Sequence, residues 1–209
     1  MKKILNVAYL FCVILLLNGC LSTLHPVFTV DDLVADNRLT GSWNKPKDGT
    51  TTTFRKAKKE ELARFSETLK QNADKIYIAK EDSGAGSKEA FYYAFLLRLG
   101  NNYYMDTYPS KFDETENTDP FYKAHYIPLH AIYRVYFNNS NSFELKPLDG
   151  GYLEKLIRNK QLRIKHEVMP DGDYLITAGT EELQQYLKKY GDVAEAYDES
   201  NTSSYTKIN

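Results

Sequence analysis

Apolar residues alternate with polar ones along much of this chain, which is the pattern of half-buried β-strands. The clearest alternation runs from Phe91 to Leu99, where the odd-numbered residues are all apolar or aromatic and Arg98 falls on the other face. From Ile127 to Phe137 the odd positions are again apolar, and the even ones include His130 and Arg134. Both segments predict long strands with one face turned to a core.

Shorter alternating segments, bounded by turn residues, predict the other strands. They are 41–43, 50–55, 75–80, 102–108, 142–148, 162–168 and 174–178. Strands joined in succession by hairpin turns argue for an antiparallel meander. A sheet of eight or nine strands curls or closes, and closure removes its exposed edges. We therefore predict a mainly β protein whose antiparallel meander closes into a barrel.

Three segments change to a helical period and predict accessory helices. From Lys58 to Asp74 the apolar residues recur at spacings of three and four, and 152–159 shows a short apolar face. The last helix, at the C-terminal end of the domain, is expected to be capped by Thr180, with acidic residues in its first turn, and to stop at Gly191. Thr29 is expected to cap a single turn over 30–33.

The N-terminus carries a different signal. Two lysines precede an uninterrupted apolar run of 11 residues, Val7 to Leu17. A membrane-spanning helix needs roughly 20 apolar residues, so the run fits the core of a signal peptide. It ends in Leu17-Asn18-Gly19-Cys20, which resembles the bacterial lipobox. The alternative is an uncleaved anchor helix in which Cys20 is incidental, and we favour the lipobox because no stop-transfer pattern follows.

The resemblance to a lipobox implies a lipoprotein cleaved before Cys20, with diacylglycerol on its thiol and often an acyl chain such as palmitate on its amine. Two or three chains hold a protein firmly, since each buried methylene contributes about 0.8 kcal/mol. The partner implied is a membrane of the bacterial cell envelope, with the outer membrane, on its periplasmic or surface face, as the expected location. The predicted organisation is a signal peptide over 1–19, a lipidated tether over 20–38, a β domain over 39–191 and a polar tail over 192–209.

Composition narrows the classes of partner. Removing Lys2 and Lys3 with the signal leaves 25 basic and 28 acidic residues, a net charge of −3. No basic stripe is present, so we do not expect nucleic-acid binding, and the charge gives no reason for adhesion to anionic lipid. Cys12 leaves with the signal peptide, so the mature body has no thiol for a disulfide or a metal. The 17 tyrosines fit either a binding surface or simple β-propensity.

Three segments together are similar to a group of uncharacterised bacterial lipoproteins with a lipocalin-like body. Leu39-Thr40-Gly41-Ser42-Trp43 resembles the G-x-W opening of lipocalin-type barrels. The sequence ITAGTEELQQYL, from Ile176 to Leu187, resembles the closing segment of that group, and the residues from Phe91 to Asp106 resemble its central hairpin. The resemblance implies a lipocalin-like barrel and an anchor, and it supplies no activity.

Candidate chemistry is sparse. The four histidines, His25, His125, His130 and His166, have no zinc-site spacing, and no serine lies in a G-x-S-x-G elbow. We therefore predict no catalytic residue, no metal and no cofactor, and we interpret His130 as a surface residue. The acidic loop residues Asp113, Glu114, Glu116 and Asp119 could gather Ca²⁺, although a solvated loop is the simpler interpretation.

Asp106 is the one carboxylate that lies within an aromatic strand, where burial would raise its pKa. A lone buried aspartate commonly bonds backbone instead. A third hypothesis is an enzyme of unrecognised type. A contact of Asp106 with His130 or His166 in an open barrel mouth would support it.

The leading functional hypothesis is a non-enzymatic barrel that binds a small amphipathic ligand or serves as a scaffold. Barrels of about eight strands either fill with side chains or hold one small ligand. The candidate ligand-binding residues are Tyr93, Phe95, Tyr103 and Tyr133, whereas Trp43 is expected to plug the barrel bottom. Bulky residues on the presumed inner faces favour a filled or narrow interior. The alternative is a protein-interaction module of an envelope or outer-membrane complex.

Overall fold

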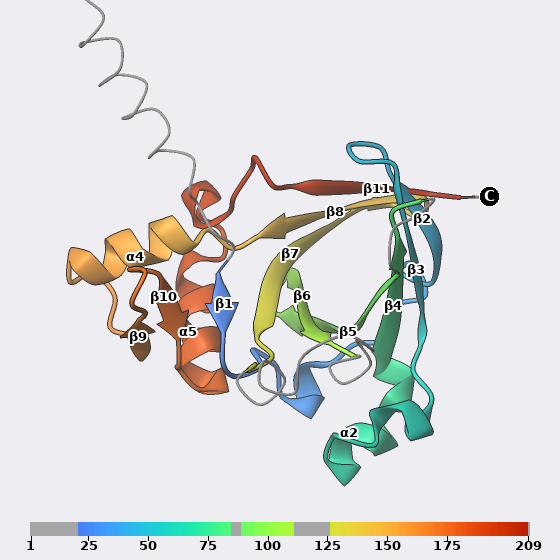
Figure 1. The fold of residues 1–209 in the computed structure, drawn as a ribbon, viewed down its shortest axis with the longest axis horizontal. Helices are drawn as coiled ribbons and strands as arrows, with labels where there is room; N and C mark the ends of the chain where they lie inside the picture. The colour runs from blue at the N-terminus through green and yellow to red at the C-terminus, as the bar shows by residue number, and fades with distance from the viewer. Residues whose placement is uncertain (1–20, 85–88, 111–125, 209) are drawn as a thin grey trace, which may run out of the picture.

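The computed structural model describes residues 21–84, 89–110 and 126–208. Eight strands form a closed antiparallel barrel in which each strand pairs with its neighbour in sequence and the last returns to the first (Figure 1). They are β2 (Gly41–Lys45), β3 (Thr50–Lys56), β4 (Ile76–Asp82), β5 (Ala90–Leu99), β6 (Asn102–Pro109), β7 (His130–Asn139), β8 (Ser142–Pro147) and β11 (Ser203–Lys207). The predicted mainly β, lipocalin-like barrel is confirmed.

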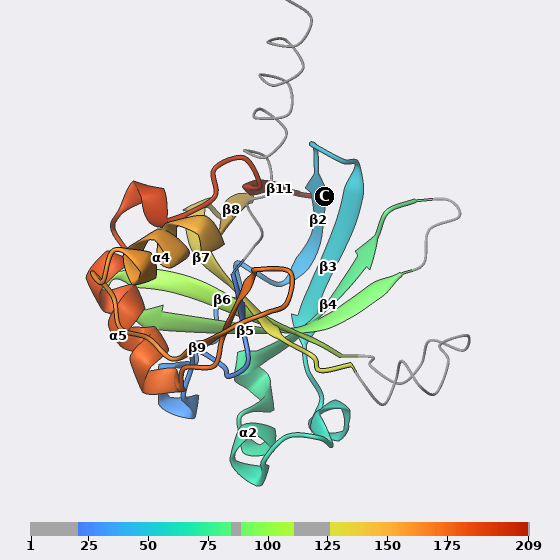
Figure 2. The same cartoon turned by 60° about the vertical axis from the view of Figure 1, so that its left-hand side comes forward.

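A smaller sheet and the two longer helices pack on one side of this barrel, and the shortest helix lies apart from them (Figure 2). The sheet consists of β1 (Ser22–Thr23), β10 (Tyr174–Ile176) and β9 (His166–Val168), and β1 joins it to the beginning of β7. The helices are α2 (Glu67–Gln71), α4 (Gly150–Arg158) and α5 (Thr180–Tyr190), with short 3-10 turns at Val30–Asp32, Lys59–Leu62, Ala73–Lys75 and Ala194–Ala196.

Two apolar cores result from this arrangement. The interior core fills part of the barrel and includes Trp43, Phe54 and Phe143. The outer core lies between the barrel wall and the segments that cover it, and it includes Phe95 and Leu183. Strand β5 is buried on both faces where it passes between the two cores, which explains its nearly continuous apolar sequence.

The sequence prediction of a polar tail over 192–209, outside a domain ending at 191, is wrong. Strand β11 pairs with both β2 and β8 and completes the barrel. The Tyr205 ring is buried and stacks on Phe143 with their centroids 4.5 Å apart. A single buried aromatic residue among polar ones gives almost no periodic signal in the sequence. The segment is recognised as a strand only from the sheet, where β2 and β8 would otherwise have unpaired edges.

The predicted tether over 20–38 is also wrong for the residues that are described. Leu21 is 2% exposed and its backbone N–H donates to the Leu148 carbonyl at 3.3 Å. Val27 and Phe28 are buried in the outer core. The residues that follow Cys20 therefore belong to the folded body. Cys20 itself lies outside the described residues, as does the predicted signal peptide.

The predicted helix over Lys58–Asp74 is divided into a 3-10 turn, the short helix α2 and a second 3-10 turn. The Ser66 side chain accepts a hydrogen bond from the Leu69 N–H and begins a new helix there. The apolar face was predicted correctly, because Leu62, Phe65 and Leu69 all pack on the outer core. Among the described residues, no helix is both long and apolar enough to cross a membrane.

Candidate functional site

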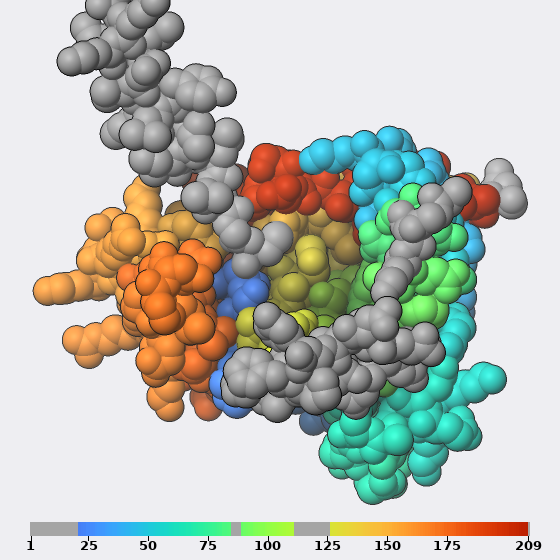
Figure 3. All heavy atoms as spheres, viewed as in Figure 1, coloured from blue at the N-terminus to red at the C-terminus, as the bar shows by residue number. Residues whose placement is uncertain are grey.

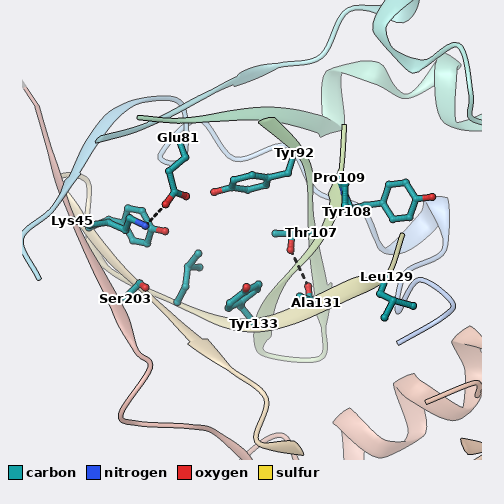
Figure 4. A pocket seen from close by; sticks show the side chains of 12 residues that line it. Lys45, Glu81, Tyr92, Thr107, Tyr108, Pro109, Leu129, Ala131, Tyr133 and Ser203 are labelled. Carbon is teal, nitrogen blue, oxygen red and sulfur yellow. Dashed lines mark hydrogen bonds and ion pairs between the residues drawn. The ribbon is translucent and has the colours of Figure 1, made fainter. Parts of the chain in front are cut away.

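A cavity of about 420 Å³ occupies one end of the barrel interior. The space-filling view of this face is hollowed between β11, the β2–β3 hairpin and the floor formed by β7 (Figure 3). The walls come from the last residues of β2, β4 and β6 and the first residues of β5, β7 and β11 (Figure 4). The lining residues are Lys45, Glu81, Tyr92, Thr107, Tyr108, Pro109, Leu129, Ala131, Tyr133, Leu145, Ser203 and Tyr205.

An ion pair lies in the wall of the cavity. Lys45 Nζ is 2.6 Å from Glu81 Oε1, and the Lys45 side chain is only 10% exposed. Asp48, in the β2–β3 turn, is a second and more distant acidic neighbour at 3.6 Å. Lys45 and Glu81 come from the ends of two strands on either side of β3, so barrel pairing brings them together. Because the two charges cancel, the cavity has polar groups but no strong net charge.

Tyrosines supply most of the remaining polar lining. Figure 4 shows the Tyr92 hydroxyl directed into the cavity. Burial raises the pKa of Tyr92 and of Tyr205 well above the ordinary value, and the nearby Glu81 carboxylate acts in the same direction. Both side chains therefore stay as neutral phenols that can donate or accept a hydrogen bond. Apolar surface from Leu129 and Leu145 completes the wall.

The opposite end of the barrel is closed by packed side chains. Trp43 is buried, its indole N–H donates to the Leu39 carbonyl at 2.9 Å, and its ring meets Phe143 edge-on. The Arg38 guanidinium lies over the Phe137 ring, 4.1 Å from its centroid. The expected role of Trp43 as a plug is confirmed, and the cavity is confined to the other end.

The structure separates the four predicted ligand-binding residues. Tyr133 lines the cavity. Tyr103 packs against the interior core at the plugged end, edge-on to Phe137. The expectation that Tyr93 and Phe95 face the interior is wrong: the Tyr93 hydroxyl donates to the Glu61 carbonyl on the outer side, and Phe95 stacks on Phe28. Neither of these two residues lines the cavity.

Sequence reasoning assigned the wrong face of β5 to the interior. The alternation marks the odd-numbered residues as more apolar, and they face the larger outer core. The even-numbered face carries Tyr92, Ala94 and Leu96, whose smaller average size leaves room inside. Lys45 and Glu81 were missed because charged residues beside turns are expected to be solvated. The prediction of a filled or narrow interior is correct only for the plugged end.

Asp106 and His130 form a buried pair on the outer face of the barrel wall. Asp106 is fully buried, and its Oδ1 lies 2.6 Å from His130 Nδ1. The Val27 N–H donates to the other carboxylate oxygen at 2.9 Å. Burial raises the Asp106 pKa, while the hydrogen bond from His130 opposes that shift. His130 is 7% exposed and lies over the Tyr108 ring, so its interpretation as a surface residue is wrong.

This pair and the cavity are separate features. Neither Asp106 nor His130 lines the cavity, and the N-terminal segment that contributes Val27 covers the carboxylate. His166 lies apart, with Nδ1 2.8 Å from the Ile164 carbonyl and its ring stacked on Tyr174. The contacts of Asp106 therefore join residues 21–28 to the barrel wall.

Arg134 makes a second buried polar junction. Its Nη1 donates to the Gly191 carbonyl at 2.8 Å and to the Tyr104 hydroxyl at 3.1 Å. The Tyr197 hydroxyl donates to the same Gly191 carbonyl. A methyl group on Gly191 would lie 2.2 Å from the Tyr104 hydroxyl oxygen, so glycine is required by this close approach. The junction fixes the end of α5 on the barrel.

Within the described part of the chain, no three His, Cys, Asp or Glu side chains gather in a way that could hold a metal ion. The acidic residues Asp113, Glu114, Glu116 and Asp119, and also His125, lie outside that part. Comparison of the chain with protein-family models, with curated proteins and with solved structures gives no match.

Proposed function

We propose that this protein is a lipid-anchored barrel that binds one small amphipathic molecule in its open end. The observation that carries the proposal is the cavity of about 420 Å³ beside the plugged half of the barrel. Small-molecule sites span about 300–1,000 Å³ and combine mostly apolar walls with a few placed polar groups. This cavity has both the volume and that combination.

The lining favours a ligand that carries no net charge. Lys45 and Glu81 already neutralise each other, so an added ion would lose its water without gaining a free counter-charge. The phenols of Tyr92 and Tyr205 can meet hydroxyl, carbonyl or amide groups of a ligand. Leu129, Leu145 and the tyrosine rings can cover an apolar or flat portion. A neutral or zwitterionic molecule with one polar edge fits these groups best.

The geometry of the first described residues bears on the anchor. In the lipoprotein that the LNGC motif implies, Leu21 is the only residue between the lipidated Cys20 and strand β1. Because Leu21 is buried and hydrogen-bonded to Leu148, no flexible spacer would separate lipid from fold. The barrel would then sit directly on the membrane surface and could exchange an amphipathic ligand with it.

Filling the cavity tests ligand binding. Ala131 is a small residue that lines the cavity, and Ala131→Phe would place a ring in the open space. We expect native mass spectrometry of the full chain, purified from its own membranes, to show a bound small molecule that is lost in Ala131→Phe. Ala63→Phe, at an exposed position that does not line the cavity, is the matched control and should retain the molecule.

A wild-type chain that carries no small molecule, or an Ala131→Phe variant that retains it, would contradict the proposal. A co-purifying protein in place of a small molecule would favour the alternative of an envelope interaction module.

The two cysteines provide a matched test of the anchor. Cys20→Ala should abolish metabolic labelling with palmitate, because the thiol of Cys20 is the proposed acylation site. Cys12→Ala, within the apolar run, should leave labelling and membrane fractionation unchanged. Labelling that persists in Cys20→Ala would exclude Cys20 as the acylation site and leave the proposal about the cavity intact.

A further inference from the structure

A second hollow lies outside the barrel, between the end of α4, the connection to β9 and the first turn of α5. Its volume is about 460 Å³. Ile157, Leu162 and Ile164 form an apolar floor that is continuous with the outer core. None of the residues lining this groove lines the barrel cavity, so the two spaces are independent.

The rim of the groove is basic. Lys160, Arg163 and Lys165 line it, their residues are exposed, and none has an ion-pair partner among the described residues. Glu182 is the one acidic residue in the lining, and His166 points its Nδ1 at the Ile164 carbonyl. The groove therefore has excess positive charge over an apolar floor, although the whole chain is slightly acidic.

The backbone at Lys160 is held in a conformation that side chains rarely adopt. Its φ of +57° is the only positive value at a non-glycine residue in the described part of the chain. The Lys160 N–H donates to Ile157 and the Gln161 N–H to Leu156, which are the bonds that end a helix and usually place glycine at this position. Strain of this kind persists where the surroundings impose it, and it motivates a search for function. Here it places a cation at the groove.

We infer that this groove binds an amphipathic anion, with a carboxylate or phosphate group on Lys160, Arg163 and Lys165 and an apolar chain on the floor. A neutral ligand suits the barrel cavity, whereas this groove offers unpaired cations beside apolar surface. A fatty acid and an anionic phospholipid share that chemistry. The inference does not depend on the proposed lipid anchor or on a ligand in the barrel.

Four probes with twelve-carbon chains test the inference on the full chain in a nonionic detergent, with native mass spectrometry as the readout. Dodecanoate and dodecyl phosphate are expected to bind about tenfold or more tightly than dodecylphosphocholine and dodecyltrimethylammonium, because only the first two bring a net negative charge to the basic rim. Preference for dodecanoate would indicate a fatty acid, and preference for dodecyl phosphate would indicate a phospholipid. Equal binding of all four probes would overturn the inference.

A charge variant identifies the groove as the site. Arg163→Gln with Lys165→Gln should weaken binding of the anions about tenfold or more, to the level of the zwitterion. Lys59→Gln with Arg64→Gln removes one exposed lysine and one exposed arginine elsewhere and should change nothing. Ala131→Phe, which fills the barrel cavity, should also leave anion binding unchanged. Full anion affinity in the Arg163/Lys165 variant would overturn the inference.

Lys160→Gly separates binding from folding. Glycine adopts the positive φ without strain, so this variant should melt at a higher temperature than the wild type. It should nevertheless bind dodecyl phosphate several-fold more weakly, because one cation is lost. A variant that is more stable and keeps full affinity would show that Lys160 contributes nothing to an anion site and would count against the inference.

Discussion

Asp106 links the N-terminal segment to the barrel through two contacts of a single buried carboxylate. His130 and the Val27 N–H both bond to it, and they belong to segments far apart in the sequence. A buried charge of this kind is costly by itself, and it is tolerated because its oxygens are satisfied. The residue that looked like a possible catalytic acid is thus a structural junction on the outer side of the wall.

Asp106→Ala should lower the free energy of unfolding by about 3 kcal/mol or more, because removing one partner leaves a buried imidazole and a buried N–H unsatisfied. Urea denaturation followed by circular dichroism measures this loss. Asp106→Asn keeps an acceptor for the Val27 N–H and should lose clearly less stability. Equal losses in the two variants would show that the hydrogen bonds are not the cause.

Helix and turn elements on the outer side are fixed by a few polar contacts as well as by their apolar faces. In the 3-10 turn Lys59–Leu62, Glu61 accepts hydrogen bonds from both terminal nitrogens of Arg55 and from the Lys58 N–H. These contacts lower the Glu61 pKa from 4.5 to about 2, and the hydrogen bond from Arg55 makes the largest contribution to this shift. The Glu61 carbonyl also accepts a hydrogen bond from the Tyr93 hydroxyl, which connects the turn to β5.

Glu61 should make stability depend on pH in acid. Its folded-state pKa is depressed, so its contribution is fully present above the unfolded pKa near 4.5 and is lost as pH falls toward 2. The pair is partly exposed, so solvent limits its contribution to under about 1 kcal/mol. Melting temperatures measured from pH 7 to pH 2 should fall less steeply below pH 5 in Glu61→Gln than in the wild type.

Glu60→Gln is the matched control for that experiment, because Glu60 is exposed and has no ion pair within the described residues. It should keep the wild-type dependence on pH. A Glu61→Gln variant with an unchanged acid profile would mean that the Arg55 contact is too solvated to affect stability.

At the scale of the whole molecule, barrel closure depends on the last few residues. Strand β11 pairs with both β2 and β8, and the Tyr205 ring stacks on Phe143 in the interior core. Without β11, two strand edges and part of the interior core would be exposed, and exposed edges promote association. The C-terminal segment is therefore as much a part of the fold as the hairpins that precede it.

A chain that ends at Asn201 should lose cooperative unfolding and form larger species than the wild type, measured by size-exclusion chromatography with light scattering. A chain that ends at Lys207 keeps all of β11 and should remain like the wild type. A truncated chain ending at Asn201 that keeps the size of the wild type and melts normally would contradict the role assigned to β11.

The sequence by itself determined the features that depend on local pattern. Most of the period-2 segments became strands, and their hairpin turns set the meander order of the barrel, because strand alternation and turn chemistry act between near neighbours. The exception is 162–168, of which only His166–Val168 is a strand, and this strand pairs with β10 outside the barrel. The helices near 152–159 and 180–190 were predictable for the same reason, since each has an apolar face. The predicted cap at Thr180 is wrong, because Thr180 lies within the helix and its hydroxyl donates to the Pro26 carbonyl. Trp43 could be assigned to the barrel bottom from its place in the first strand.

Tertiary structure alone decided which side of each strand faces which core. Alternation separates the two faces of β5 but cannot say that the more apolar one, with Tyr93 and Phe95, lies under the helices. It also could not show that Asp106 meets His130, or that Lys45 meets Glu81, because those contacts join residues 24 and 36 positions apart across neighbouring or next-but-one strands. The formation of strand β11 also depends on tertiary structure. Its sequence has only a weak alternation, and it becomes a strand because it pairs with the free edges of β2 and β8.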